Sequence, residues 1–470
     1  MFKKQIMTAA FALSLGSAFN AQAYDPVATC NLSQSDFNKW FASGQPAKNG
    51  IVTFANSVGF PTNNTVCDFY KWSHQMFLWT TSPLGSGILL DSAVFYDVNV
   101  NPTTGIATYI SNASGGTQNN RFALRGAKPQ SIQPGGQAGG GDTLLSLNGS
   151  LVYFAMHAND VYAWFNTAVT NGVLPATTPF PSSQAELTPI VNYAQANGAA
   201  LGDANALTME LKTAWVDATT VSPLSDYVTI QASVPNYTKV SATSWTINTS
   251  QSTVNKTLAL VGMHVVGPVQ GHPELVWATF EHARNAPDNT FYVSIPNPFI
   301  PPFQVPYNSS GTWNFMTNGG SQTGALVSQM TVNGTTGAIT ATTGNTIQPN
   351  NVYRAMPWGN LPTPAAANNN SQLISLNNDV RGMLSKLSDV RSHYFQVGAV
   401  WTQNGSIPSS ASDTAKQIGS KLLANSTMET YHQTNKNGCF GCHFGSSSTA
   451  VSHLFSTTNV PLVPPPKKSK

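Results

Sequence analysis

Hydrophobic residues recur at helical spacing near the N-terminus and at strand-like spacing through most of the later chain. Apolar side chains three and four residues apart predict helices at Gln34–Phe41 and Asp68–Trp79. From about residue 88, short apolar or alternating runs bounded by turn residues predict β-strands instead. The expected strands are Ala93–Val100, Ile106–Ile110, Leu144–Phe154, Tyr227–Ala232, Leu258–Val266, Leu275–Phe280, Thr290–Ile295, Met330–Val332 and Ala338–Ala341. The first two and the last two flank glycine-containing turns and therefore predict β-hairpins.

Helical periodicity returns inside the chain and near its end. Val161–Val169 and Gln184–Lys212 carry apolar positions at helical spacing, and so does Ser371–Thr402. Ser412 and Asp413 are suitable caps for a further helix that extends to about Gln433. The expected fold class is therefore α+β. A large β-rich body with N-terminal helices spans 24–365, a helical C-terminal region spans 366–460, and 461–470 is a Pro- and Lys-rich disordered tail.

The composition fits a folded protein with few surface charges. Only 9% of residues are charged, while 41% are hydrophobic and 10% aromatic, which excludes a disordered chain. The formal net charge is +3, but Lys3, Lys4, Lys467, Lys468 and Lys470 lie at the two ends. The body is therefore close to neutral, and no basic stripe with interleaved aromatic residues indicates a nucleic-acid partner.

The first 23 residues have the features of a secretory signal peptide. Lys3 and Lys4 precede an apolar stretch from Ile6 to about Phe19, and Ala21-Gln22-Ala23 is a small-x-small cleavage site. The mature chain is then expected to begin at Tyr24, the alternative being an anchor helix that is never cut. No later segment has the apolar length of a membrane span, so a periplasmic or secreted protein is expected.

The four cysteines fall into two pairs with different implications. Cys30 and Cys67 lie near the mature N-terminus, where an oxidising compartment favours a disulfide. The alternative is two free buried thiols. A metal site shared by all four cysteines is disfavoured because only the second pair, Cys439 and Cys442, has ligand spacing.

The second pair belongs to a C-x-x-C-H sequence formed by Cys439, Cys442 and His443. Two thiols three residues apart reach the two vinyl groups of one porphyrin, and the next histidine lies under the ring as an iron ligand. The motif therefore predicts one covalently attached haem c. The alternatives are a thioredoxin-type redox pair, half of a zinc site, or a structural disulfide.

The second axial ligand is less constrained by sequence. No methionine follows His443, so the usual downstream methionine ligand of small cytochromes is absent. His453, ten residues on, is the candidate sixth ligand, with a solvent-exposed loop histidine as the alternative. Met428 and His432 precede the motif and are weaker candidates.

Four other histidines are weighed as iron or metal ligands against a structural role in the core. His264 and His282 lie beside apolar runs, the latter next to Glu281, and each is a candidate for a metal or haem-pocket role. A hydrogen-bonded core histidine is the alternative that the composition of their surroundings favours. His74 and His157 have less to suggest a ligand role.

Several segments resemble exported bacterial proteins of the cytochrome c family that carry a single C-terminal C-x-x-C-H haem site. The segments are Leu422–Tyr431 before the motif, the aromatic segment His393–Trp401, and two core segments, Gly262–Val266 and Trp277–His282. The resemblance extends over much of the chain from about 70 to 455. The resemblance implies a bound haem and a redox function but no particular substrate. It assigns roles only to the three haem-attachment residues, Cys439, Cys442 and His443.

Two functions from different classes follow from a single redox haem. The first is electron transfer to or from a redox partner protein. The second is a haem-dependent oxidoreductase of the peroxidase or oxygenase type, with a pocket for a small-molecule substrate in the β-rich body. A haem-based sensor is a third alternative. No G-x-x-x-x-G-K-[ST], H-E-x-x-H or G-x-S-x-G motif indicates phosphate binding or hydrolysis.

Overall fold

The main element of the fold is a ten-stranded antiparallel sheet within the described residues. The computed structural model describes residues 30–60, 64–85, 87–101, 104–111, 123–124, 142–295, 297, 299–334, 336–413, 416–434 and 438–465. The proposed signal peptide, 1–23, lies outside the described residues. The fold class is α+β, as expected from the sequence.

The helices and strands have the following bounds. The helices are α1 Gln34–Trp40, α2 Val66–Thr80, α3 Asp160–Thr170, α4 Gln184–Ala196 and α5 Ala367–Lys386. The strands of the first half are β1 Pro83–Leu84, β2 Gly87–Ile88, β3 Phe95–Val100, β4 Ala107–Ser111, β5 Ala123–Leu124, β6 Tyr153–Asn159, β7 Glu210–Asp217, β8 Thr229–Pro235, β9 Tyr237–Ser241 and β10 Ser244–Ile247. Those of the second half are β11 Thr253–Val269, β12 His272–His282, β13 Phe291–Val293, β14 Phe303–Val305, β15 Met330–Val332, β16 Ile339–Ala341, β17 Tyr394–Thr402 and β18 Gln417–Gly419.

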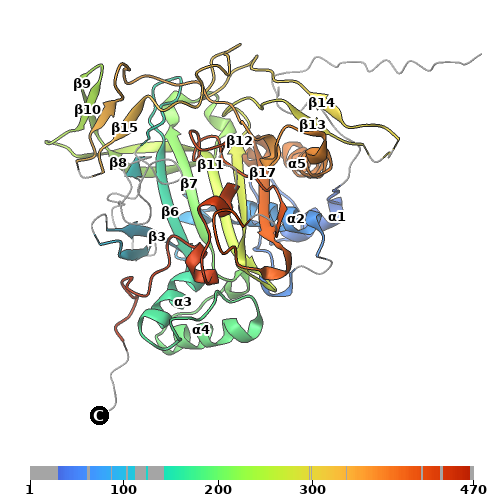
Figure 1. Ribbon diagram of the computed structural model, residues 1–470. Helices are drawn as coiled ribbons and strands as arrows, with labels where there is room; N and C mark the ends of the chain where they lie inside the picture. The colour runs from blue at the N-terminus through green and yellow to red at the C-terminus, as the bar shows by residue number, and fades with distance from the viewer. Residues whose placement is uncertain are drawn as a thin grey trace, which may run out of the picture.

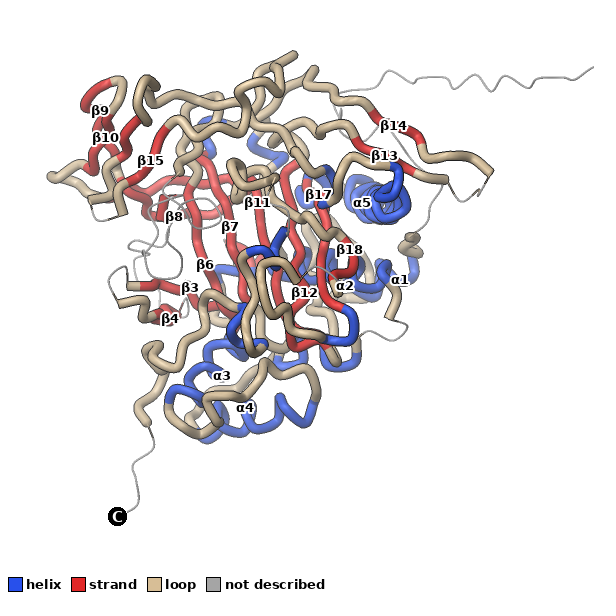
Figure 2. The backbone as a smooth tube through the Cα atoms, viewed as in Figure 1, coloured by secondary structure: helices blue, strands red, loops and turns tan. Residues whose placement is uncertain are grey.

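The order of the strands brings distant parts of the chain together. The main sheet runs β18-β17-β12-β11-β7-β6-β3-β4, with β5 added to β6 and β8 added to β11 (Figures 1 and 2). β11 is long enough to pair with β8 through its first half and with β7 and β12 further along. The two hairpins expected from the sequence are confirmed as β3–β4 and β15–β16.

Each face of the sheet is covered by a different part of the chain. On β12, the ring of Phe280 stacks on Phe77 of α2, with 4.4 Å between ring centroids. The neighbouring residues Thr279 and Glu281 instead bond to Asn425 and Ser426. Because successive side chains of a strand point to opposite faces, α2 covers one face and the C-terminal segment the other. Figure 1 shows this segment, in red, crossing in front of β11 and β12.

The N-terminal segment is attached to this body by a disulfide and by capped helices. Cys30 and Cys67 are bonded, with 5.5 Å between their Cα atoms, which confirms the pairing expected from the sequence. The Thr65 side chain accepts from the backbone N–H of Asp68 at the start of α2, and the Asp68 carboxylate accepts from the N–H of Thr65. This reciprocal capping satisfies two backbone donors at the helix end.

Four secondary-structure predictions are corrected by the fold. The strand expected over Leu144–Phe154 begins only at Tyr153, as β6, and the residues before it form a turn with an isolated bridge between Leu145 and Leu151. The helix expected to reach Thr402 ends at Lys386, and 394–402 form β17. Every residue of β17 is buried, so it lacks the alternation that distinguishes a half-exposed strand from a helix. The helix expected up to Lys212 ends at Ala196, because 210–217 form β7. No helix covers the described residues between 412 and 433, which form β18 and turns.

The tail expected to be disordered from residue 461 is ordered over its first residues. The backbone N–H of Leu462 donates to Thr167 Oγ1 at 3.0 Å, and Asn171 donates to the carbonyl of Val463 at 2.9 Å. Leu462 and Val463 are therefore attached to the C-terminal end of α3, and 466–470 lie outside the described residues. In the described part of the chain, no helix combines the length and apolar character needed to cross a bilayer.

A pair of buried carboxylates near α3 makes stability depend on pH. Burial, together with the charge of Asp203, raises the pKa of Asp160, and burial raises the pKa of Asp203. Because both values lie above those of the unfolded chain, the folded state holds protons that the unfolded state has lost between the two pKa values of each group. The free energy of unfolding should therefore fall as the pH rises from about 4, the ordinary pKa of an aspartate, to about 6 for Asp203 and to about 8 for Asp160.

Urea unfolding of the wild-type protein and of Asp203→Asn at pH 6 and pH 8.5 checks this expectation. The wild-type protein should lose stability at the higher pH, by at most about 1.4 kcal/mol per pH unit for each proton. Asp203→Asn should lose less, because one like charge is gone. Burial also raises the pKa of Glu210, to about 7, so the difference between the two proteins isolates the pair. If the free energy of unfolding depended on pH equally in both proteins, the Asp160–Asp203 pair would not be the cause of the loss.

Candidate haem-binding site

The C-x-x-C-H residues form a single helical turn. The backbone N–H of Cys442 and that of His443 both donate to the carbonyl of Cys439, at 3.1 and 2.9 Å. Residues three and four apart on such a turn lie on one side of it. The turn therefore presents Cys439, Cys442 and His443 together, which is the physical reason that this spacing suits one porphyrin.

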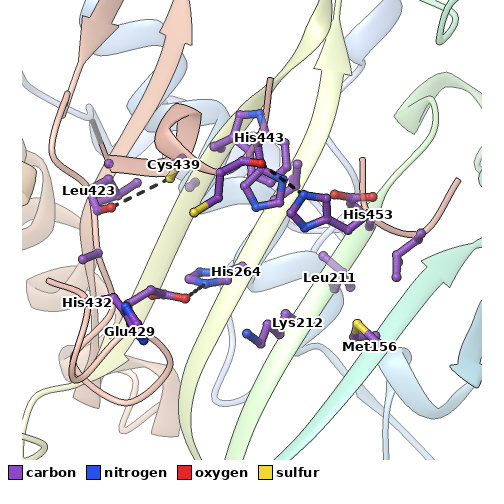
Figure 3. Close-up of a pocket in the computed structure, with 18 of the residues that line it drawn as sticks. Met156, Leu211, Lys212, His264, Leu423, Glu429, His432, Cys439, His443 and His453 are labelled. Atoms are coloured by element: carbon purple, nitrogen blue, oxygen red, sulfur yellow. Dashed lines mark hydrogen bonds and ion pairs between the residues drawn. The ribbon is translucent and has the colours of Figure 1, made fainter. Parts of the chain in front are cut away.

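These three residues line a pocket between the C-terminal segment and the face of the main sheet. We call it the motif pocket. One side consists of the motif, 422–424, His453 and Leu454. The other side is built by four strands, with Met156 from β6, Glu210, Leu211 and Lys212 from β7, His264 and Val266 from β11, and Trp277 and Ala278 from β12. In the view of Figure 3, Cys439, His443 and His453 lie across the pocket from His264, Glu429, Lys212 and Met156.

The His443 ring is held in one orientation. Its Nδ1 lies 2.8 Å from the carbonyl oxygen of Val451, and the ring centroid lies 4.0 Å from that of Trp277. Because a carbonyl only accepts, Nδ1 carries the proton and Nε2 has the lone pair that a metal needs. A backbone carbonyl on the far ring nitrogen is the usual support of a histidine that ligates a metal.

The two cysteines of the motif do not form a disulfide with each other. The Sγ atom of Cys439 lies 3.9 Å from the carbonyl oxygen of Leu423, and neither cysteine is in a disulfide. Burial raises the pKa of the Cys439 thiol well above its ordinary value, and the negative charge of Glu429 adds to this effect. A redox pair of the thioredoxin type relies on a thiol of lowered pKa, and the pKa of Cys439 is shifted in the opposite direction.

The donor set and the wall of the motif pocket fit a haem. Two thiols that are not in a disulfide and an oriented imidazole share one side. The pocket walls include apolar residues from both sides: Leu211, Val266, Trp277, Leu422, Leu423 and Leu454. Apolar walls with a few convergent polar groups are typical of cofactor sites. Among the residues that the structure describes, no group of three or more His, Cys, Asp and Glu side chains is arranged to hold a metal ion directly.

Known proteins offer no independent guide to this site. No family model, curated protein or solved structure matches the chain.

His453, the candidate sixth ligand, lies on the same side of the motif pocket as His443. The two rings are stacked with 4.0 Å between centroids, and Nε2 of His453 is 3.2 Å from the carbonyl oxygen of Cys442. Two axial ligands bind from opposite faces of a haem, so His453 would have to leave this position to complete the coordination of the iron. Axial ligation by His453 stays a prediction.

A His453→Gly variant tests that prediction. In the arrangement described here, we expect the reduced variant to respond to carbon monoxide as the wild-type protein does. If His453 binds the iron, its removal opens a coordination position, and carbon monoxide should shift the absorption bands of the variant alone. A visible spectrum of each reduced protein, before and after the gas is added, distinguishes the two results.

The other candidate ligands differ in whether they lie in the core or face the motif pocket. Met428 is buried in a core cluster and does not line the motif pocket, whereas His432 does and lies 3.7 Å from Asp142. His282 stacks on Tyr227 in the core, with 3.8 Å between centroids, as the core-histidine alternative predicted. His74 and His157 are also buried, and burial lowers the pKa of His74 to about 3.

His264 differs from these, because it faces the motif pocket and is paired with a residue that the sequence did not single out. Its Nε2 lies 3.0 Å from Oε1 of Glu429. The two residues are 165 positions apart, and no sequence pattern links them. Lys212 and Glu210 were not predicted as site residues for the same reason, since only the strand order brings them to the motif. Trp277 was named only as part of a core segment and not as a site residue.

Proposed function

We propose that this protein is an exported c-type cytochrome with one haem attached through Cys439 and Cys442, and that it transfers single electrons. His443 serves as an axial ligand. The observation that supports the proposal is that one helical turn places both thiols and this imidazole on the same side of a pocket. A haem bound there supplies a one-electron redox centre.

The residues of the chain have separable tasks in this proposal. The thiols of Cys439 and Cys442 hold the cofactor covalently, and the carbonyl of Val451 fixes the tautomer of His443. The leucines and Trp277 exclude water from the pocket, which lowers the local dielectric and so sets the energy of adding an electron. A redox partner protein is the proposed source or acceptor of the electron.

A haem-dependent oxidoreductase is the second candidate, and one observation favours it. The β-rich body supplies a whole side of the motif pocket, including the polar side chains of Lys212 and His264. An electron carrier needs only to enclose its haem, whereas an enzyme needs such groups beside the iron. The peroxidase or oxygenase type of reaction belongs to this candidate.

Protein made with its N-terminal leader in a host competent for cytochrome maturation tests both candidates. We expect a coloured product whose mass is that of the processed chain plus one haem. Addition of carbon monoxide to the reduced protein should leave the bands unchanged if two axial ligands serve electron transfer. A prompt shift indicates an open position and favours the oxidoreductase. A colourless product at the mass of the bare chain would refute both.

A further inference from the structure

The His264–Glu429 pair is a fixed polar feature of the motif pocket, on the side opposite His443 in Figure 3. Nε2 of His264 lies 3.0 Å from Oε1 of Glu429, and Oε2 of Glu429 accepts from the backbone N–H of Asn425 at 2.8 Å. The side chains of the pair are 21% and 18% exposed. The carboxylate is thus held in place on both oxygens, and the pair retains access to solvent.

The other nitrogen of His264 contacts a hydroxyl that can serve two protonation states. Nδ1 lies 2.8 Å from Oγ1 of Thr279, the residue opposite His264 in the register of β11 and β12. That hydroxyl also accepts from the side-chain amide of Asn425 at 2.9 Å and lies 3.3 Å from the carbonyl of Met263. Its single proton can therefore point either to His264 or to the Met263 carbonyl.

Each direction of the Thr279 proton suits one state of the imidazole. When the hydroxyl donates to Nδ1, His264 is neutral and its Nε2–H donates to Glu429. When the hydroxyl donates to Met263, Nδ1–H of a cationic His264 donates to the Thr279 oxygen, and Nε2–H still donates to Glu429. In both states the two ring nitrogens of His264 and the Thr279 hydroxyl each have a hydrogen-bond partner, so the imidazole can gain or lose a proton without leaving its own nitrogens unpaired.

The charges around His264 come from two elements besides its own strand. β7 contributes Lys212, which is opposite His264 in the register, and Glu210, whose carboxylate is bonded to Ser452. The C-terminal segment contributes Glu429, His432 beside Asp142, and the histidines His443 and His453 of the motif side. Glu429 and Cys439 line the same pocket, and the negative charge of Glu429 contributes to the raised pKa of the Cys439 thiol.

We propose that the His264–Glu429 pair is a redox-linked proton site of this pocket. When a one-electron donor reduces the haem, His264 takes up one proton from solvent, and it releases that proton on oxidation. The added negative and positive charges cancel, which avoids an uncompensated charge in an enclosed, low-dielectric pocket. The inference rests on the proposed function, and it makes the electron transfer proton-coupled.

The midpoint potential measured against pH, on the haem-loaded protein, tests the proposal. For the wild-type protein we expect the potential to fall as pH rises within about 5 to 8, where histidine changes its charge. The slope should approach 59 mV for each tenfold change in proton concentration, the constant for a one-electron, one-proton couple. His264→Gln should remove the slope. Glu429→Gln should keep it but move it to lower pH, because the imidazolium loses its carboxylate partner.

His432→Gln is the matched control, since His432 lines the same pocket and should not change the slope. Proton release and uptake in weakly buffered solution give a second readout, with about one proton taken up per electron in the wild-type protein and none in His264→Gln.

A flat wild-type potential, or a slope that survives in His264→Gln, overturns the proposal while the haem spectrum still supports the proposed function. If His264→Gln fails to fold, the test is whether the sloping part of the potential curve lies at lower pH in Glu429→Gln than in the wild-type protein. An unchanged curve then overturns the proposal. A wild-type product without a haem spectrum overturns the proposed function itself and this proposal with it.

Discussion

Arg354→Met is expected to lower the free energy of unfolding by about 3–5 kcal/mol, the usual cost of leaving a buried carboxylate without its partner. Arg354 is 1% exposed and bonds to Glu281 at 3.1 Å and to Asp288 at 2.5 Å. Glu281 is fully buried on β12, and it also accepts from the backbone N–H and the hydroxyl of Ser426. Loss of Arg354 would therefore weaken the attachment of the C-terminal segment to the sheet as well as the ion pair.

Urea unfolding at pH 7, followed by fluorescence, measures this change. Lys256→Met is the matched control, because Lys256 pairs with Asp217 but keeps 31% of its side chain exposed. A pair of that kind contributes at most about 1 kcal/mol. If both substitutions lowered the free energy of unfolding equally, burial of the Arg354 ion pairs would add nothing to their contribution to stability, and the expectation would be wrong.

The double variant Cys439→Ala with Cys442→Ala is expected to lose covalently bound haem completely. Both thiols line the motif pocket, and each is the proposed source of one thioether bond. Either single variant should keep one bond and therefore still show the added mass of a haem, in lower yield. Mass spectrometry of the denatured proteins separates these results, because denaturation removes any haem that is bound without a covalent link.

The other cysteine pair supplies the control for this experiment. Cys30 and Cys67 form a disulfide, and its loss through Cys30→Ala with Cys67→Ala should cost about 3 kcal/mol of stability but leave the haem attached. Haem in the double variant of Cys439 and Cys442 would contradict thioether attachment. Absence of haem from the disulfide variant would show instead that misfolding alone explains the loss.

Local sequence patterns were sufficient for elements whose signals are complete within a few residues. α2 begins with a Thr65–Asp68 capping box and carries its apolar face at helical spacing, and the β3–β4 hairpin has its turn residues between two strands. The Cys30–Cys67 bond could be predicted because these are the two cysteines that the C-x-x-C-H motif does not use. The signals of the helix and the hairpin each lie within a short stretch of chain.

The arrangement around the motif could not be predicted because it depends on strand order. β17 is apolar on both faces, so its pattern does not distinguish a strand from a buried helix, and it was predicted as helix. His264 and Glu429 meet only because β11 lies at the centre of the sheet beneath the C-terminal segment. The motif itself was visible in the sequence, whereas the wall that faces it was not.

The position of β17 in the main sheet limits how this protein can be divided. β17 pairs with β12 on one side and β18 on the other, and about forty residues later the same stretch of chain presents the C-x-x-C-H turn. A fragment that begins near residue 366 would carry the cysteines without the strands that form the other side of the motif pocket. A fragment that ends there would expose the edge of β12. The segment that carries the C-x-x-C-H motif therefore cannot be moved into another protein by itself, and a fusion that keeps the motif pocket has to include the whole sheet.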